Sequence, residues 1–287
     1  MTFQQQLKYK FSQFSIVEKV IVINVICFAI PLLLNTFLFL FKVPSNSLTA
    51  WVELSSNPTT FLSRPWTFIT YGFFHSGFFH LFWNMILLYF SGRTLVNLFP
   101  KEKFMSIYFL GIFCGAVLFV VSYWLFPVFE GTQPALIGAS AGVMAVLIFV
   151  CTYMPNLEVS FFFFLRLKLR YLGIALVVLD LLQIPSSNAG GHIAHLGGAI
   201  LGFFYAYQLK KGIDIGTPFK NFLSFKFFSS ESKVKKRKPK NPSKSNTTSY
   251  SQEEQVKIDT ILDKISKSGY DSLSKEEKNF LFQAGKK

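Results

Sequence analysis

The chain has 287 residues, of which 51% are hydrophobic, 18% are aromatic and only 15% carry a charge. An ordinary soluble domain carries about 25% charged residues, so the composition excludes one. The formal net charge of +14 comes mostly from a Lys-rich stretch near the C-terminus and does not indicate a nucleic-acid-binding face. Cys27, Cys114 and Cys151 each lie inside an apolar block, which suits neither a disulfide framework nor a zinc site.

Apolar blocks predict six membrane-spanning helices, because crossing a bilayer takes about 20 apolar residues. The second block contains Arg93, whose long side chain can reach the membrane surface, and the short fifth block contains Asp180. We therefore expect an all-α membrane protein, a bundle of six transmembrane helices. The predicted spans cover residues 20–41, 78–99, 104–129, 136–153, 171–184 and 192–209.

The distribution of Lys and Arg predicts the orientation of these spans. Basic residues gather before the first span, between the second and third, between the fourth and fifth, and after the sixth. The connections on the opposite side contain only Lys42 and Arg64. Because basic loops stay in the cytoplasm, we expect both termini to be cytoplasmic. No cleavable signal peptide is evident at the N-terminus.

Composition divides the chain into three regions. Residues 1–209 form the membrane domain, and residues 210–250 form a basic linker rich in Lys, Ser, Asn and Pro that cannot bury enough apolar area to fold. The linker is interpreted as a disordered cytoplasmic tether, a role compatible with contact to anionic lipid headgroups.

Residues 251–287 are predicted to form a small two-helix cytoplasmic unit. Gly269 is placed to end the first helix, and Ser274 with Glu277 three residues later forms a capping box for the second. A unit of this size has little core, so we expect it to dock on a partner, which the sequence does not identify.

Polar side chains inside the predicted spans are candidates for function, because burying them in lipid is costly. They are His80 and Asn84 in the second span, Ser140 in the fourth, and His192 and His195 in the sixth. The even-numbered spans all run from the outer side inward. His80, Asn84, Ser140 and His195 therefore share one layer, roughly 5–10 Å below the outer surface at about 1.5 Å rise per residue.

Ser140 and His195 have the chemistry of a nucleophile and its base. A serine hydroxyl attacks a carbonyl only when a base takes its proton, and His is the usual base. Ser140 also lies at a helix start, where free backbone N–H groups can bind an oxyanion, and His80 and Asn84 could add donors. The pairs Gly138/Gly142 and Gly198/Gly202 have the G-x-x-x-G spacing that lets helices approach closely.

Other interpretations stay open for single residues. Ser140 alone could hydrogen-bond its own helix, and His75 could tie the preceding loop to the second span. His192 could be structural or could face a substrate. Asp180 could orient a histidine, or bond Gln183 or a loop amide. A metal site at the histidines is not expected, since H-E-x-x-H spacing is absent.

These motifs resemble the rhomboid intramembrane serine proteases, of the bacterial six-helix type with a C-terminal cytoplasmic extension. The resemblance covers residues 14–209. It is carried by Arg64 and Trp66 in RPWTFITYGFFHSGFFHLFWN, the H-x-x-x-N pair His80 and Asn84, the GASAG motif around Ser140, and His195 in AHLGGAILG.

The resemblance implies a Ser140–His195 catalytic dyad with no acidic third member. It implies an oxyanion site made by His80, Asn84 and the backbone N–H of Ser140, with Ala139 nearby, and it needs neither cofactor nor metal. The substrates would be other transmembrane proteins, cut in or near a membrane-spanning segment. The expected location is a bacterial cytoplasmic (inner) membrane, with the active site opening to the outer side.

The resemblance further implies a first loop, residues 42–77, that lies partly in the membrane and braces the site. Two positions depart from the family pattern: Ala141 replaces a frequent glycine, and Met144 replaces a frequent aromatic residue. An inactive rhomboid-like protein that binds or escorts membrane proteins is the alternative, and a small transporter is a third class. The dyad residues favour the protease, and no charge lies at mid-span as a transporter would need.

Overall fold

The computed structural model describes residues 2–43, 48–161, 165–185, 188–219 and 252–284. The chain divides into two compact units, residues 1–229 and 230–287, and each is described by itself. Most of the predicted linker, residues 220–250, lies outside the described residues, as do residues 44–47 of the first loop.

The first unit is mostly helical, as predicted, with two very small antiparallel sheets. Its α-helices are α1 Phe3–Gln13, α2 Ile16–Leu40, α3 Pro58–Ser63, α4 Thr67–Thr70, α5 Phe78–Leu98, α6 Lys101–Leu125, α7 Ser140–Tyr153, α8 Leu169–Gln183 and α9 Ala189–Lys210. Its strands are β1 Leu54–Ser55, β2 Ala135–Leu136, β3 Glu158–Phe161 and β4 Leu165–Lys168, and 3-10 turns at Leu48–Trp51, Tyr71–Phe73 and Pro127–Phe129 complete it.

Within the described residues, two helices are long and apolar enough to cross a membrane by length and composition alone. They are α2 and α6, and α7 is a shorter apolar helix. The count of six spans therefore stays a prediction. Ser15 and Glu18 form a capping box at the start of α2, with the Glu18 carboxylate 2.7 Å from the Ser15 backbone nitrogen.

The core of the bundle is the close packing of α6, α7 and α9, whose backbones approach through small residues. A Cβ on Gly198 would collide with the carbonyl oxygen of Ala141, and one on Gly202 would collide with that of Ala145. On the α6 side, a Cβ on Gly115 would lie 2.5 Å from the Ala141 methyl group. Helix α7 is therefore held on two sides, and its residues from Ala141 to Cys151 are buried.

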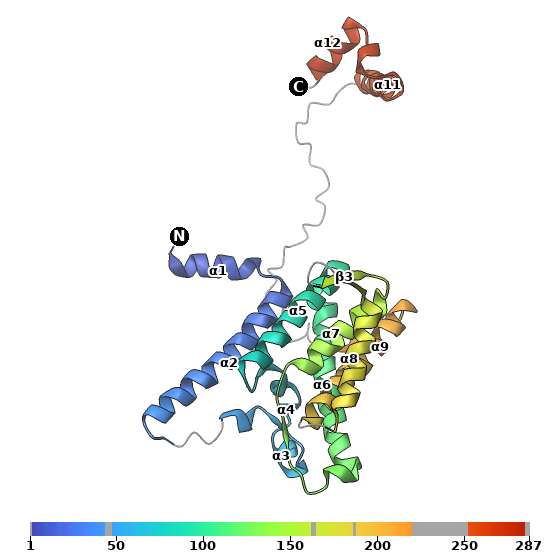
Figure 1. The fold of residues 1–287 in the computed structure, drawn as a ribbon. Helices are drawn as coiled ribbons and strands as arrows, with labels where there is room; N and C mark the ends of the chain where they lie inside the picture. Colours follow the sequence, from blue (N-terminus) through green and yellow to red (C-terminus); the bar gives the residue numbers. More distant parts are fainter. Residues whose placement is uncertain (1, 44–47, 162–164, 186–187, 220–251, 285–287) are drawn as a thin grey trace. The chain divides into compact units, whose positions relative to one another are not determined.

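Helices α5, α7 and α9 all begin at one end of the bundle, the end that carries α3 and α4 (Figure 1). There β1 pairs with β2, placing Leu54 opposite Leu136, so the first loop is joined directly to the segment that leads into α7. The hairpin of β3 and β4, with Glu158 opposite Lys168, lies at the other end. The topology thus brings three helix starts and the first loop together.

The first loop is held in shape by its own aromatic and basic residues. The Arg64 guanidinium donates a hydrogen bond to the carbonyl oxygen of Ala50, and its centre lies 4.3 Å from the Trp51 ring. The Trp66 indole N–H donates to the carbonyl oxygen of Trp51 at 2.8 Å. Two residues that carry the family resemblance, Arg64 and Trp66, thus both fasten the segment around Trp51.

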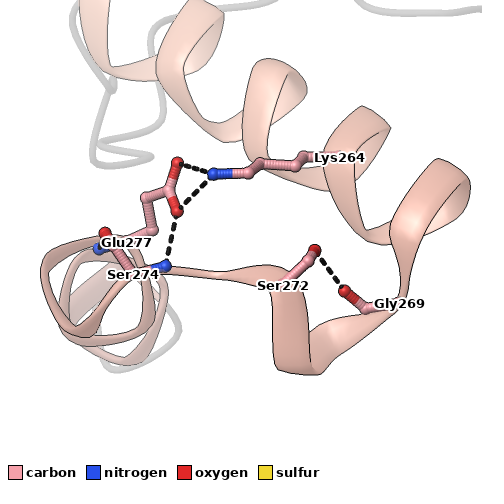
Figure 2. Close-up of polar contacts among 5 residues, drawn as sticks. All are labelled: Lys264, Gly269, Ser272, Ser274 and Glu277. Carbon is pink, nitrogen blue, oxygen red and sulfur yellow. Dashed lines mark hydrogen bonds and ion pairs between the residues drawn. The ribbon is translucent and has the colours of Figure 1, made fainter.

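The second unit contains α11 Gln252–Ser268, a 3-10 turn at Tyr270–Ser272 and α12 Lys275–Ala284. Gly269 follows α11 at φ 78°, where a glycine is favoured. The predicted capping box is confirmed, because the Ser274 N–H donates to the Glu277 carboxylate at 2.7 Å (Figure 2). In return, the Glu277 N–H donates to the Ser274 hydroxyl at 3.2 Å. Lys264 bridges from α11 to both oxygens of Glu277 at 2.9 Å (Figure 2).

Candidate active site

Ser140 is the first residue of α7, and the turn before it is held by the first loop. Gly138 has φ 138°, and its N–H donates to the carbonyl oxygen of Tyr71 at 3.0 Å. The Ala139 N–H points to Nε2 of His75, 3.5 Å away. Two contacts from the first loop therefore fix the backbone just ahead of the Ser140 hydroxyl.

His80, in the first turn of α5, lies directly against the turn before Ser140. A Cβ on Gly138 would lie 2.7 Å from Cε1 and 2.8 Å from Nε2 of the His80 ring, and 3.6 Å from the hydroxyl oxygen of Ser140. The other ring nitrogen, Nδ1, is 3.1 Å from the Ser76 hydroxyl. The Nε2 edge of His80 and the Ser140 hydroxyl thus share the space that the missing side chain of Gly138 leaves open.

The position of His195 follows from the register of α7 and α9. Gly198 packs against Ala141, and Gly202, four residues later, packs against Ala145, four residues later on α7. The two helices therefore run parallel in a fixed register. In this register His195 lies level with Gly138, about 3 Å along the helix axis from Ser140. His195 also interacts electrostatically with His80.

Within the described part of the chain, no hydrogen bond joins the Ser140 hydroxyl to His195. Catalytic hydrogen bonds are often long in unliganded sites and close only around substrate. The structure therefore brings Ser140 and His195 to one end of the bundle without a hydrogen bond between them.

Asp180, near the end of α8, contacts two histidines at once. Its Oδ1 lies 2.8 Å from Nδ1 of His195 and 2.8 Å from Nδ1 of His192. Of the alternatives that the sequence leaves open for Asp180, the structure shows the contact with histidines. It also differs from the dyad without an acidic partner that the resemblance implies, because α8 turns back into α9 and delivers the carboxylate to the start of that helix.

Two predicted oxyanion donors have other partners. The Asn84 side-chain amide is buried and donates to the carbonyl oxygen of His80 at 2.8 Å, within its own helix. The Ala139 N–H is directed to His75. The structure thus places Asn84 and Ala139 at the site but gives neither a contact to the hydroxyl of Ser140.

His75 is the site residue whose part sequence reasoning understates. The sequence predicts a tie between the loop and the second span, and the buried ring makes it, lying 5.1 Å, edge to face, from the ring of His80 on α5. The His75 ring also accepts a hydrogen bond from the Ala139 N–H in the turn before Ser140. The sequence feature that could have predicted the contact between the two rings is the position of His75 five residues before His80. All four histidines of the chain therefore surround the start of α7 and α9 in two ring pairs.

Among the described residues, Asp180, His192 and His195 also have the composition of a metal site. One ligand atom from each lies within 4.8 Å of the others. In this structure one Asp180 carboxylate oxygen accepts hydrogen bonds from Nδ1 of both imidazoles.

Comparison with known proteins identifies the family. The profile of the Rhomboid domain matches residues 62–212, more than half of the chain, and a family of unknown function (DUF6576) matches residues 248–287. The chain belongs to the rhomboid family.

Curated relatives share the first of these regions. The mitochondrial presenilin-associated rhomboid-like proteins of Bos taurus and Homo sapiens are 33% and 32% identical over 177 residues, which cover 60% of this chain and 45% of each relative. The mitochondrial RHOMBOID-like protein 12 of Arabidopsis thaliana is 27% identical over 157 residues, covering 51% of this chain and 47% of that protein. The chain spans about half the length of the curated relatives it matches.

The expected bacterial cytoplasmic membrane is wrong on this comparison, because these relatives are named as mitochondrial proteins. The charge distribution that suggests cytoplasmic termini indicates only which connections share one side of a membrane. It does not identify the membrane, so the cytoplasmic assignment of the termini loses its basis as well.

Proposed function

We propose that this protein is an intramembrane serine endopeptidase that cleaves other membrane proteins in or near a transmembrane segment. The observation that supports the proposal is the contact of Gly198 with Ala141, which fixes the parallel register of α7 and α9 and is consistent with a base at His195 for Ser140. Membership of the rhomboid family supports it. Five further helical spans would accompany α6 across the bilayer, and the names of the relatives favour a mitochondrial membrane.

In the proposed mechanism the Ser140 hydroxyl attacks the peptide carbonyl. His195 accepts the hydroxyl proton at Nε2 and returns it to the leaving amine. The developing oxyanion is stabilised by the Ser140 backbone N–H, which has no partner within the helix, and by a donor from His80. When the Ser76 hydroxyl donates to Nδ1 of His80, Nε2 of that ring carries the hydrogen and faces the open space beside Gly138. One such donor contributes about 3 kcal/mol to the transition state in known cases.

Cleavage of a transmembrane substrate by the purified full chain tests this function. Ser140→Ala and His195→Ala should each abolish cleavage, a loss of about a thousandfold or more, because nucleophile and base act as a unit. Ser91→Ala is the matched control, since the Ser91 hydroxyl only donates to the carbonyl oxygen of Leu87 in its own helix at 2.6 Å. Cleavage by Ser140→Ala at the rate of the unmodified chain would contradict the proposal.

One observation favours the alternative of an inactive protein that binds membrane proteins. The contact between Ser140 and His195 is open in the structure, as it would be in a site that never closes. A fluorophosphonate, which reacts with an activated serine hydroxyl, separates the two functions. Covalent labelling that depends on Ser140 supports the protease, and absence of labelling in a chain that still retains substrate supports the alternative.

A further inference from the structure

We propose that Asp180 is a positioning residue for His195, and that His192 in turn holds the Asp180 carboxylate. This inference rests on the proposed function and deepens it. The general base, His195, would then belong to a hydrogen-bonded group of three side chains. In this group the Asp180 carboxylate from α8 lies between the two imidazoles from α9, at the end of the bundle that carries Ser140.

Burial and geometry carry the first step. Asp180 is 8% exposed, and a carboxylate with so little water needs hydrogen-bond donors to remain ionised. The donors it has are the rings of His192 and His195, each with Nδ1 at 2.8 Å from the same oxygen. These distances are typical of charge-assisted hydrogen bonds, so the three groups form one hydrogen-bonded unit.

The second step is the tautomer of His195. A carboxylate oxygen only accepts hydrogen bonds, so a neutral ring bonded to it must carry its hydrogen on Nδ1. Nε2 is then left with a free lone pair, as a general base requires. Within the described residues, Asp180 is the hydrogen-bond partner of Nδ1 of His195, and without it the ring could rotate or carry its hydrogen on the wrong nitrogen.

The third step is charge. When His195 takes the serine proton it becomes an imidazolium, and the adjacent carboxylate stabilises that cation in a site with little water. Among the described residues, the other titratable groups shown to interact with His195 are His192 on its own helix and His80 from α5. Neither is an anion, so Asp180 supplies the negative charge.

His192 has a separate part in this arrangement. Because both rings share one oxygen, His192 fixes the rotamer of the Asp180 side chain without reaching Ser140 itself. Removing the ring should loosen the carboxylate, whereas a side-chain amide at this position can still donate to it. His192→Ala is therefore expected to reduce kcat about tenfold, and His192→Gln to restore part of that loss.

A purely structural explanation must be separated from this one, because the same hydrogen bonds also fasten α8 to α9. A fastening role would alter stability and substrate binding together. A positioning role lowers kcat while KM and the unfolding midpoint stay near those of the unmodified chain. In a serine protease triad, replacing the Asp by Asn lowers kcat about 10⁴-fold, and a reduction of a hundredfold or more is expected for Asp180→Asn.

The experiment uses the full chain in proteoliposomes with ¹⁵N-labelled histidine. The chain has four histidines, so the ring-nitrogen spectrum is small enough to assign by substitution. The unmodified chain and the inactive Ser140→Ala variant should both show the hydrogen of His195 on Nδ1, and Asp180→Asn should lose that tautomer together with kcat. A hydrogen on Nε2 in the unmodified chain, or an unchanged kcat in Asp180→Asn, overturns the inference.

Two outcomes keep this inference distinct from the proposed function. If the unmodified chain neither cleaves nor reacts with a fluorophosphonate, the proposed function fails, and a His195 ring that still carries its hydrogen on Nδ1 supports the Asp180 contact on its own. A chelator should leave kcat unchanged. Loss of activity on chelation with recovery in Zn²⁺ would make Asp180, His192 and His195 metal ligands and overturn the positioning role.

Discussion

At the scale of single residues, Gly138 decides where the side chains of the candidate site can lie. Its φ of 138° is one that L-amino acids rarely adopt, and the His80 ring occupies the place where its Cβ would be. A side chain here would strain the turn and displace the ring that lies beside the Ser140 hydroxyl.

Gly138→Ala is therefore expected to reduce cleavage at least tenfold and to destabilise the fold by about 1–3 kcal/mol through backbone strain. Gly77→Ala is a close control, because Gly77 has an extended backbone and a Cβ there would meet no atom within 4 Å. The rate of fluorophosphonate labelling and the unfolding midpoint in detergent measure the two effects. Equal rates for the Gly138 and Gly77 variants would show that the turn does not position the site.

The sequence predicts which residues belong to the candidate site, but it does not predict which hydrogen bonds they form. The sequence places Ser140 near the start of the fourth span, and the structure begins α7 at Ser140 itself. The contact of Asp180 with His192 and His195 is one alternative among several in the sequence, because it depends on how α8 turns into α9. The partner of Asn84 is not predictable either, since an amide can bond its own helix as well as a neighbour.

At the scale of helices, the contact between α7 and α9 is the most extensive in the bundle. It depends on glycines, because the backbone of one helix lies where a side chain of the other would be. The G-x-x-x-G spacing at Gly198 and Gly202 predicts close approach from the sequence alone. The structure confirms it, because a methyl group at either glycine would collide with the backbone of Ala141 or Ala145.

Gly198→Ala should therefore force α7 and α9 apart next to Ser140. Overpacking of this kind typically costs about 1–3 kcal/mol, and cleavage should fall further than stability because the distance from Ser140 to His195 increases. Ile200→Ala on the same helix is the control, since that side chain is 62% exposed. Denaturation in mixed detergents and kcat together measure the effect, and a fully active Gly198 variant would refute this account of the register.

Helix ends are less predictable than helix positions. The fourth predicted span begins at residue 136, but Leu136 pairs with β1 and the helix begins four residues later. The third predicted span reaches residue 129, whereas α6 ends at Leu125 and Pro127 starts a 3-10 turn. In both cases the apolar sequence is longer than the helix. Strand pairing excludes Leu136 from α7, and Pro127 lies beyond the end of α6.

At the scale of the whole chain, the rhomboid region and the C-terminal unit belong to separate compact bodies. Within the second body, Glu277 links α11 to the start of α12. The backbone N–H of Ser274 and then the Lys264 ammonium hold the pKa of the Glu277 carboxyl below its usual value. Since the folded-state pKa is lowered, this contribution to stability is present at neutral pH and is lost as pH falls through the lowered pKa.

Glu277→Ala is consequently expected to loosen the second unit while leaving cleavage by the first unchanged. Amide hydrogen exchange in peptides from 252–284 of the full chain should speed up at neutral pH, because the variant loses both the capping box and the bond to Lys264. Glu276→Ala removes the neighbouring carboxylate and should have no such effect. As the pH falls, the unmodified chain should approach the exchange behaviour of the Glu277 variant, after correction for the intrinsic pH dependence of exchange. Loss of cleavage in Glu277→Ala would instead show that the integrity of the second unit governs the active site of the first.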